Sequence, residues 1–313
     1  MEHHSPGELG AGHVMDHPSK ILKAMGGHAR KRFGQHFLAS TSVVQRIVGL
    51  AQLDVGADIS RVVEIGPGIG SMTETLLDAG AAVLAVELDR DLAEWLRQRF
   101  GDNPRFHLLE SDAAKLDYGD VIREANAHFD AALGMPTKPA RWQVVSNLPY
   151  NVGTGITTEL LRHPDLFSRL VLMLQKEVAE RMIAPVGDRN RGSLSVFVQS
   201  RSEAALRIRV SPGSFYPPPR VGSAVVELVL RPQPLTGGAN SEVFERVCRV
   251  AFSAPRKAVR NALSNGYARA LVDACLESSD VPPTTRAATL DIDTLGRLAM
   301  ALEPDAHAEL IEP

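Results

Sequence analysis

The chain has 313 residues, 44% of them hydrophobic, which is enough for one large core or for one large and one small core. Its 34 Lys and Arg against 37 Asp and Glu give a formal net charge of -3, and this average argues against a nucleic-acid-binding protein. No apolar run approaches the roughly 20 residues of a membrane span, and the first residues lack a signal-peptide layout, so we expect a cytoplasmic protein. Cys248 and Cys275 lack the spacing of metal ligands, so we expect reduced cysteines in helices, with no disulfide and no metal.

The predicted elements alternate between strand and helix. A helix over 41–53 comes first, followed by strands at Arg61–Ile65, 81–88, 105–110, 141–147 and 168–175 and by helices at Ser71–Asp78, 89–100, 154–163 and 177–183. The stretch 125–141 holds Gly134, Pro136 and Pro139 and reads as a loop. Strands at 205–210 and 222–230 form an antiparallel pair at the end of the sheet. The pattern predicts an α/β fold, a Rossmann-like, doubly wound, mostly parallel sheet of seven strands.

The composition also predicts a division into parts. Residues 1–28 form a flexible N-terminal arm, and 29–233 form the main α/β domain. A linker with Pro232, Pro234, Gly237 and Gly238 leads to a small helical domain over 239–304, and 305–313 form an acidic tail.

The charges are strongly segregated along the chain. The formal charge is -7 over 39–161 and again over 271–313, but it is +9 over 162–270. A basic segment of this kind is typical either of a solvated surface balanced by an acidic tail or of a surface that binds nucleic acid.

Closely spaced glycines follow the first sheet strand. Gly66, Gly68 and Gly70 lie between a strand and a helix, where a ligand can approach the backbone closely. Twenty-one residues after Gly66, Glu87 ends the next strand, where its carboxylate can accept hydrogen bonds from a ribose. These residues predict a cofactor that contains adenosine.

The glycine loop departs from the G-x-G-x-x-G pattern of dinucleotide sites. With Glu64 it has the E-x-G-x-G form, which resembles motif I of S-adenosylmethionine-dependent methyltransferases. In that resemblance Asp112, just after the third strand, is the acid that accepts the adenine amine of the cofactor.

The tetrapeptide Asn147-Leu148-Pro149-Tyr150 follows the fourth sheet strand, at the edge where open α/β sheets bind ligands. The exocyclic amine of adenine is a poor nucleophile because its lone pair is delocalised into the ring. The Asn147 amide oxygen and the Leu148 carbonyl could hold its N–H groups and aim the lone pair at a methyl donor. Pro149 would stiffen the turn, Tyr150 would stack on a flipped-out base, and Phe215 is a candidate for the opposite face.

Taken together, these segments resemble the ribosomal RNA adenine dimethyltransferase family, and within it the enzymes that dimethylate two adjacent adenosines near the 3' end of small-subunit RNA. Further segments similar to the family are ARKRFGQHFLAS, LQKEVAERM, GSLSVFVQ, SFYPPPRVGSAVVEL and FSAPRKAVRNAL. The resemblance implies S-adenosylmethionine as cofactor, small-subunit ribosomal RNA or the assembling small subunit as partner, and a role in ribosome biogenesis. We expect a monomer that does not bind membranes.

The resemblance also implies site residues. The cofactor would contact Gln35, His36, Leu38, Glu64, Gly66, Gly68, Glu87, Leu88, Asp112, Ala113 and Asn147. RNA phosphates would contact Arg181, Arg189, Arg191, Arg220, Arg256, Lys257 and Arg260. The chain departs from the family at His36, where Asn is more frequent, at Ser40, where Asp is more frequent, and at Arg191, where an aromatic residue is usual; the loop between Asp112 and Asn147 is also longer.

Two other functions fit parts of the sequence. A ribosome assembly protein that has lost catalysis would keep the fold, but the intact tetrapeptide and Glu87 argue against it. A nicotinamide-dependent oxidoreductase would explain the glycine loop and Glu87, but neither the tetrapeptide nor the basic segment.

Overall fold

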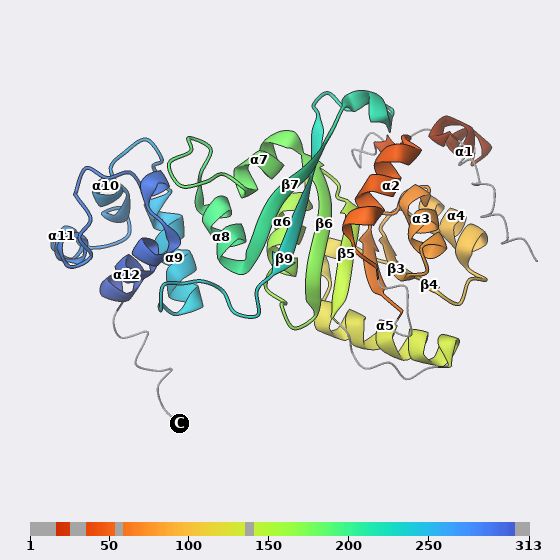
Figure 1. Ribbon diagram of the computed structural model, residues 1–313, viewed down its shortest axis with the longest axis horizontal. Helices are drawn as coiled ribbons and strands as arrows, with labels where there is room; N and C mark the ends of the chain where they lie inside the picture. Colours follow the sequence, from red (N-terminus) through yellow and green to blue (C-terminus); the bar gives the residue numbers. More distant parts are fainter. Residues whose placement is uncertain (1–16, 26–35, 54–58, 135–140, 304–313) are drawn as a thin grey trace, which may run out of the picture.

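A seven-stranded sheet forms the centre of the computed structural model, which describes residues 17–25, 36–53, 59–134 and 141–303 (Figure 1). The strand order is β4 (Phe106–Glu110), β3 (Ala82–Glu87), β2 (Arg61–Ile65), β5 (Trp142–Asn147), β6 (Phe167–Gln175), β9 (Ser223–Leu230) and β7 (Ser202–Val210). The first five run parallel, whereas β9 is antiparallel to both β6 and β7. The predicted sheet, with its antiparallel pair at one end, is confirmed.

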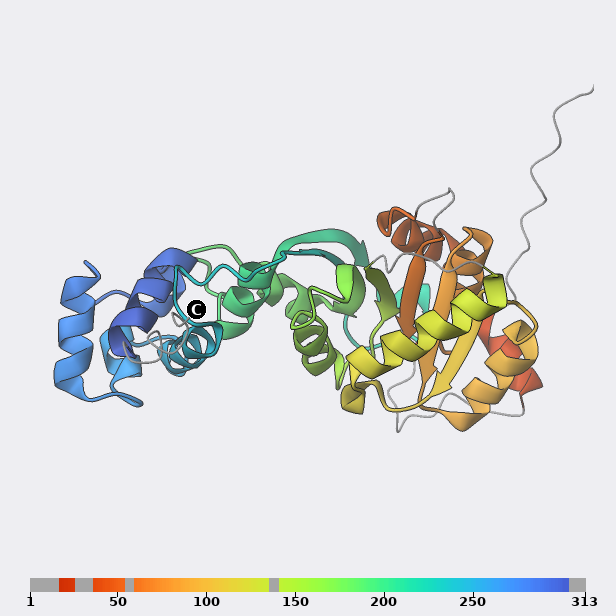
Figure 2. The same ribbon diagram turned by 90° about the horizontal axis from the view of Figure 1, so that it is seen from below.

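Helices cover both faces of this sheet, as its largely buried parallel strands require. Alternate residues of β2 point to opposite sides: Val62 packs with α2 (Thr41–Leu50), α3 (Ser71–Asp78) and α4 (Arg90–Phe100). Val63 and Ile65 pack with α5 (Tyr118–Leu133), α6 (Gly153–Leu160) and α7 (Lys176–Met182). Figure 2 shows α5 lying across its face of the sheet. The sheet is therefore doubly wound.

The prediction of a loop over 125–141 was wrong for its first half. Helix α5 runs from Tyr118 to Leu133; its N-cap Asp117 accepts a hydrogen bond from the backbone nitrogen of Asp120 at 3.1 Å. Tyr118, Ile122, Ala125 and Phe129 are buried on one face of this helix. Gly134, with a φ of 65°, ends it. Gly134, on which the loop prediction partly rested, therefore marks the end of a helix, and Pro136 and Pro139 lie outside the described residues.

Part of the expected N-terminal arm is also a helix. Helix α1 (Pro18–Ala24) buries Ile21 and Leu22 against Phe37, Ile69 and Leu92. The prediction of a flexible arm was therefore wrong for 17–25. Burial of the two neighbouring apolar side chains Ile21 and Leu22 is enough to dock so short a helix. Residues 1–16 and 26–28 lie outside the described residues.

The C-terminal helices share a hydrophobic core of their own. It is formed by α9 (Ser241–Ala251), α10 (Val259–Leu263), α11 (Arg269–Ser278) and α12 (Ile292–Leu302), and helix α8 (Ser193–Arg201) joins it through Val196. Figure 2 shows these helices at one end of an elongated molecule. Cys248 and Cys275 are buried, unpaired thiols in α9 and α11. We keep the domain limits 29–233 and 239–304 as a proposal.

A second, two-stranded sheet lies apart from the main one. In it β1 (Phe37–Leu38) pairs antiparallel with β8 (Phe215–Tyr216), so two segments far apart in sequence are held together. Within the described ranges, no helix has the length and apolar character needed to cross a membrane.

Candidate active site

A cavity of about 430 Å³ opens at the carboxyl ends of β2, β3 and β5. Most of the residues predicted for the cofactor and for catalysis line it: His36, Leu38, Glu64, Gly66, Gly68, Glu87, Leu88, Asp112, Asn147, Leu148, Pro149 and Tyr150. Ala113 is not among the lining residues, and Gln35 lies outside the described residues. The structure thus brings together segments from five separate parts of the chain, at the sheet edge where parallel sheets bind ligands.

The glycine loop lets the cavity reach the backbone. Gly68 has a φ of 62°, and a Cβ at this position would come within 3.0 Å of the Phe37 ring. Gly70 is needed for packing instead, because a Cβ at this position would lie 2.5 Å from the Phe100 ring. The third glycine of the motif therefore serves the packing of α3 on α4, and the first two border the cavity.

Glu64 carries an unpartnered buried oxygen. Its Oε2 accepts a hydrogen bond from the Thr73 hydroxyl at 2.6 Å, while Oε1 is buried without a partner among the described residues. The pKa of Glu64 is raised to about 8, chiefly by burial and to a smaller extent by the nearby charge of Glu87. A buried carboxyl oxygen beside a cavity is suited to a cationic group of a ligand.

Glu87 is held rigidly at the end of β3. Its Oε1 accepts hydrogen bonds from the backbone nitrogens of Leu88 and Asp89, both at 2.9 Å, and its Oε2 accepts one from Gly68 at 3.2 Å. Burial nevertheless raises the pKa of Glu87 to about 7. A carboxylate oxygen has room for a further donor, so Glu87 can accept a hydrogen bond from a ribose hydroxyl.

Asp112 lies after β4 on the same side of the cavity. Its Oδ1 accepts a hydrogen bond from the backbone nitrogen of Ala114 at 3.1 Å, and Lys115 approaches its other oxygen at 3.5 Å. This capping interaction holds the carboxylate, and because Asp112 lines the cavity it can accept a hydrogen bond from an adenine amine.

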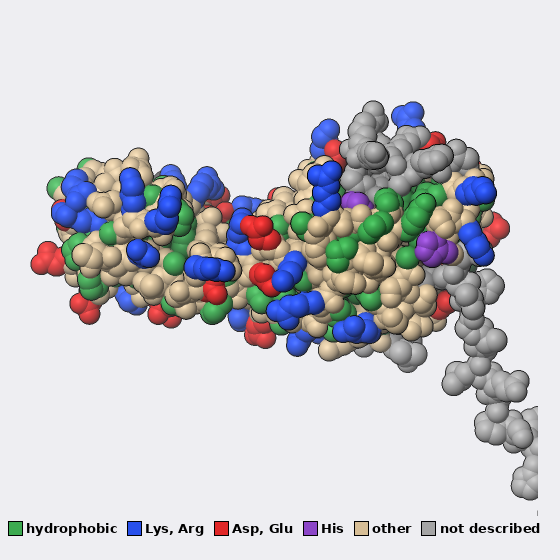
Figure 3. Space-filling model, turned by 90° about the horizontal axis from the view of Figure 1, so that it is seen from above, with side chains coloured by type: hydrophobic (Ala, Val, Ile, Leu, Met, Phe, Trp, Pro, Cys, Tyr) green, Lys and Arg blue, Asp and Glu red, His purple; other side chains and the backbone are tan. Residues whose placement is uncertain are grey.

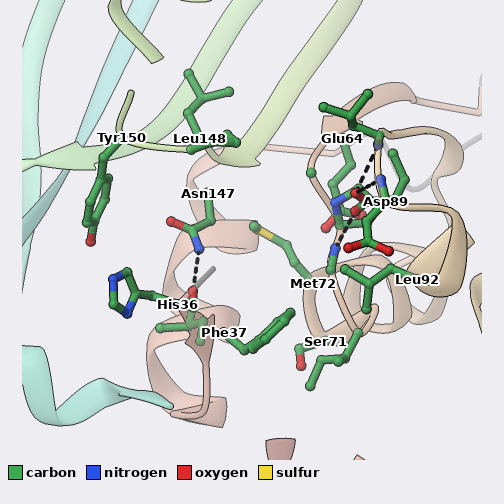
Figure 4. A pocket seen from close by; sticks show the side chains of 18 of the residues that line it. His36, Phe37, Glu64, Ser71, Met72, Asp89, Leu92, Asn147, Leu148 and Tyr150 are labelled. Atoms are coloured by element: carbon green, nitrogen blue, oxygen red, sulfur yellow. Dashed lines mark hydrogen bonds between the residues drawn. The ribbon is translucent and has the colours of Figure 1, made fainter. Parts of the chain in front are cut away.

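The tetrapeptide lies opposite the acidic residues, and hydrogen bonds hold Asn147, Leu148 and Tyr150 in place (Figure 4). The Asn147 Nδ2 donates to the main-chain oxygen of His36 at 3.3 Å. Leu148 is buried, and its nitrogen donates to the Met173 oxygen of β6 at 3.1 Å. The Tyr150 hydroxyl lies 2.6 Å from the Ser223 hydroxyl, and burial raises the pKa of Tyr150. The tyrosine is therefore neutral at physiological pH.

The prediction that Phe215 forms part of the catalytic site is not met in this structure. Phe215 pairs with Leu38 in the two-stranded sheet and is only 4% exposed. It packs in the core on the α2 side of the main sheet and is not among the cavity's lining residues. Its neighbour Tyr216 takes the exposed position instead, because successive residues of a strand point to opposite sides.

Several lining residues were missed by sequence reasoning. They are Phe37, Val44, Pro67, Ile69, Ser71, Met72, Asp89, Leu92, Asn151 and Val152. Phe37 stands between two predicted contacts, and Asp89 lies two residues after Glu87, so proximity to a motif was an available signal. Pro67 and Ile69 lie in the glycine loop, and Asn151 and Val152 directly follow the tetrapeptide, so they too adjoin a motif. The others line the cavity from α2, α3 and α4, and their residue types give no signal.

The cations predicted to bind RNA lie mostly on the surface. Arg181, Arg189, Arg220, Arg256 and Lys257 are exposed. Arg260 forms a forked ion pair with Asp273, which neutralises it in part. Figure 3 shows Lys and Arg side chains spread over the end of the molecule that holds the C-terminal helices.

Arg191 is an exception, and the prediction that it contacts RNA was wrong. Its side chain is 3% exposed and donates to the Ala184 oxygen at 3.1 Å and to the Gln199 side chain at 2.8 Å. Burial lowers its pKa. The position lies in the interior, so the aromatic residue expected from the family resemblance would also be buried there.

Comparison with known proteins identifies close relatives. A model of the family described as ribosomal RNA adenine dimethylase matches residues 26–302. The chain is 37% identical to ribosomal RNA small subunit methyltransferase A of Geobacter metallireducens, over 90% of this chain and 98% of the relative. It is 42% identical to the protein of the same name from a Synechococcus species, over 85% and 90%. The fold is shared with a dimethyladenosine transferase from Plasmodium falciparum at a TM-score of 0.67 and 24% identity, covering 84% and 96%.

Proposed function

Because the chain belongs to the ribosomal RNA adenine dimethylase family, we propose that its cavity binds S-adenosylmethionine and that Asn147–Tyr150 direct methyl transfer to adenine amines of small-subunit ribosomal RNA. The product is dimethyladenosine at two adjacent positions, made during assembly of the small subunit. One observation carries the proposal: the tetrapeptide and the three carboxylates of Glu64, Glu87 and Asp112 line the same cavity.

The residues divide the work between them. The cofactor supplies an electrophilic methyl group on a sulfonium. Asn147 is held by its amide nitrogen, which leaves its Oδ1 free to accept an N–H of the target amine. Tyr150 offers an aromatic surface for the flipped-out base. No general base is required for the attack, so the chain contributes positioning and electrostatics.

The acidic side of the cavity fits the cofactor. The unpartnered Oε1 of Glu64 suits the α-ammonium group, Glu87 suits the ribose, and Asp112 suits the adenine amine. A further consequence is that binding should depend on pH. The pKa of Glu64 is about 8 in the free protein, and a bound cation lowers it, so the free protein holds more protons than the complex.

Affinity for S-adenosylmethionine should therefore rise severalfold between pH 6 and about pH 8 and then level off, because the cofactor's own amino group begins to lose its proton near pH 8. Calorimetry at pH 7 in two buffers of different ionisation enthalpy should detect proton release on binding. Glu64→Gln, which keeps the shape, should abolish most of this release. Equal proton release in the variant and the wild type would contradict the role of Glu64.

RNA affinity should fall steeply with salt although the net charge is -3. Replacing both Arg256 and Lys257 by alanine should reduce the slope of log affinity against log salt by about 1.4 for single-stranded RNA. Arg123→Ala is the matched control, because that exposed arginine lies on α5, in the acidic part of the chain, and pairs with Asp120. If the salt slope of RNA affinity falls equally in the double variant and in Arg123→Ala, the assignment of Arg256 and Lys257 to RNA binding is refuted.

The function can be tested in cells that lack their own small-subunit dimethylase. Dimethylation removes both N–H donors of the adenine amine, so reverse transcription of the RNA should stop at two adjacent adenosines when this chain is expressed. The Asn147→Ala variant should leave the RNA readable. Full read-through with the wild-type chain present would argue against the proposal.

A further inference from the structure

We propose that His36 is a positioning residue that holds both Asn147 and Tyr150 in their working orientations. The inference rests on the proposed function and adds a residue to its substrate side. His36 touches each of the two residues through a different part of its structure, and a third contact fixes its own ring.

The main chain of His36 orients the amide of Asn147. Its carbonyl oxygen can only accept, so the group of Asn147 that points at it at 3.3 Å must be the NH₂. The amide oxygen is then turned away from His36 and toward the cavity that Asn147 lines. This is the orientation that an adenine amine requires, because its N–H groups need an acceptor.

The side chain of His36 is fixed by the loop after β8. Its Nδ1 lies 2.8 Å from the main-chain oxygen of Pro217. Since a carbonyl oxygen donates no proton, the Nδ1 of His36 must carry the hydrogen of this bond. The ring is thereby anchored to the loop that lies between β8 and β9, far from Asn147 in sequence.

The fixed imidazole stacks on Tyr150. The ring centroids are 5.9 Å apart, and the planes are inclined by 29°. Each stacked layer needs about 3.4 Å, so a base inserted between the two rings would need about 7 Å. A target base must therefore use the other face of Tyr150, with His36 behind the tyrosine and the hydroxyl of Ser223 at its tip.

The position of His36 in the cavity agrees with this role. Figure 4 shows His36 and Tyr150 together on one side of Asn147, whereas Glu64 and Asp89 lie on the other side. Phe37, the next residue, points toward the acidic side. Neighbouring residues of this short segment thus serve the two halves of the cavity, and the imidazole belongs to the half that receives the base.

The test compares His36→Ala with His36→Phe. Alanine removes both the stack and the anchor, whereas phenylalanine restores an aromatic ring behind Tyr150. The first measurement is the fluorescence of an RNA fragment with 2-aminopurine at the target position, which reports unstacking of that base. The second is the dissociation constant of S-adenosylmethionine, measured by calorimetry, and the third is the KM for RNA.

We expect His36→Ala to weaken the fluorescence response and raise the KM for RNA, each by about threefold to tenfold, with cofactor affinity within about twofold of the wild type. His36→Phe should recover most of the response. If His36→Ala instead weakens cofactor binding and leaves the fluorescence unchanged, the inference is overturned. Combining His36→Ala with Tyr150→Ala should add little to Tyr150→Ala alone, and full additivity would equally contradict it.

Failure of this inference is distinguishable from failure of the proposed function. If the wild-type chain methylates adenosine and His36→Ala unstacks the base normally, only the role of His36 is wrong. If the wild-type chain transfers no methyl group to RNA, the proposed function itself is wrong. Thermal unfolding of both variants checks that His36→Phe, the less disruptive change, reports on a folded protein.

Discussion

Replacing Asn147 by alanine should slow methyl transfer to RNA by about 10²- to 10³-fold, the effect of removing one preorganised polar group from a developing charge. The attacking nitrogen gains positive charge as the bond to the methyl carbon forms, and the Asn147 oxygen is the side-chain acceptor held toward that nitrogen. Truncation leaves the amine without this acceptor and without a fixed direction for its lone pair. Single-turnover kinetics with saturating cofactor would measure the change.

Two comparisons make the Asn147 result specific. Cofactor affinity should change by no more than about threefold in calorimetry, because Glu64, Glu87 and Asp112 are untouched. Asn147→Asp keeps an acceptor but loses the NH₂ that donates to His36, so it should fall between alanine and the wild type. Single-turnover rates within a few-fold of the wild type in the alanine variant would disprove the proposed role of Asn147.

Replacing Glu87 by alanine should weaken S-adenosylmethionine binding by about 1–3 kcal/mol, or roughly fivefold to 150-fold. The carboxylate is fixed by three backbone N–H groups and is 6% exposed, so no neighbour can take over its contact with a ribose. The nitrogens of Gly68, Leu88 and Asp89 would also lose their acceptor. Equilibrium binding at pH 8, where the carboxylate is ionised, gives the full effect.

The matched control is Glu94→Ala. Glu94 is an exposed residue of α4 that does not line the cavity. Its replacement by alanine removes the same charge as Glu87→Ala. The dissociation constant of the Glu94→Ala variant for S-adenosylmethionine should equal that of the wild type within a factor of two. The ribose role of Glu87 is refuted if the two variants weaken cofactor binding to the same extent.

The sequence predicted the sheet and the cavity well because the signals there are local. The central strands are short runs in which apolar residues predominate. Glu64, Glu87 and Asn147 stand at or next to strand ends, where the topology of a parallel sheet places them side by side. Helix α5 was missed because Gly134 and the prolines after it outweighed a helical spacing that begins at Tyr118.

The remaining errors come from tertiary contacts that no local pattern reveals. Arg191 is buried because Ala184 and Gln199 satisfy its guanidinium, and neither partner is recognisable from the sequence. Phe215 is turned into the core by its pairing with Leu38, a residue far away in the chain. The role inferred for His36 depends in the same way on Pro217 and Tyr150.

The methylated product shows directly whether the chain catalyses adenine dimethylation or only binds the small ribosomal subunit. The purified chain would be incubated with tritium-labelled S-adenosylmethionine and small ribosomal subunits that lack the modification, and the RNA would then be digested to nucleosides. We predict label in dimethyladenosine with the wild-type chain and almost none with Asn147→Ala. Label in any other nucleoside, or no label in RNA from a chain that binds the cofactor, would contradict it.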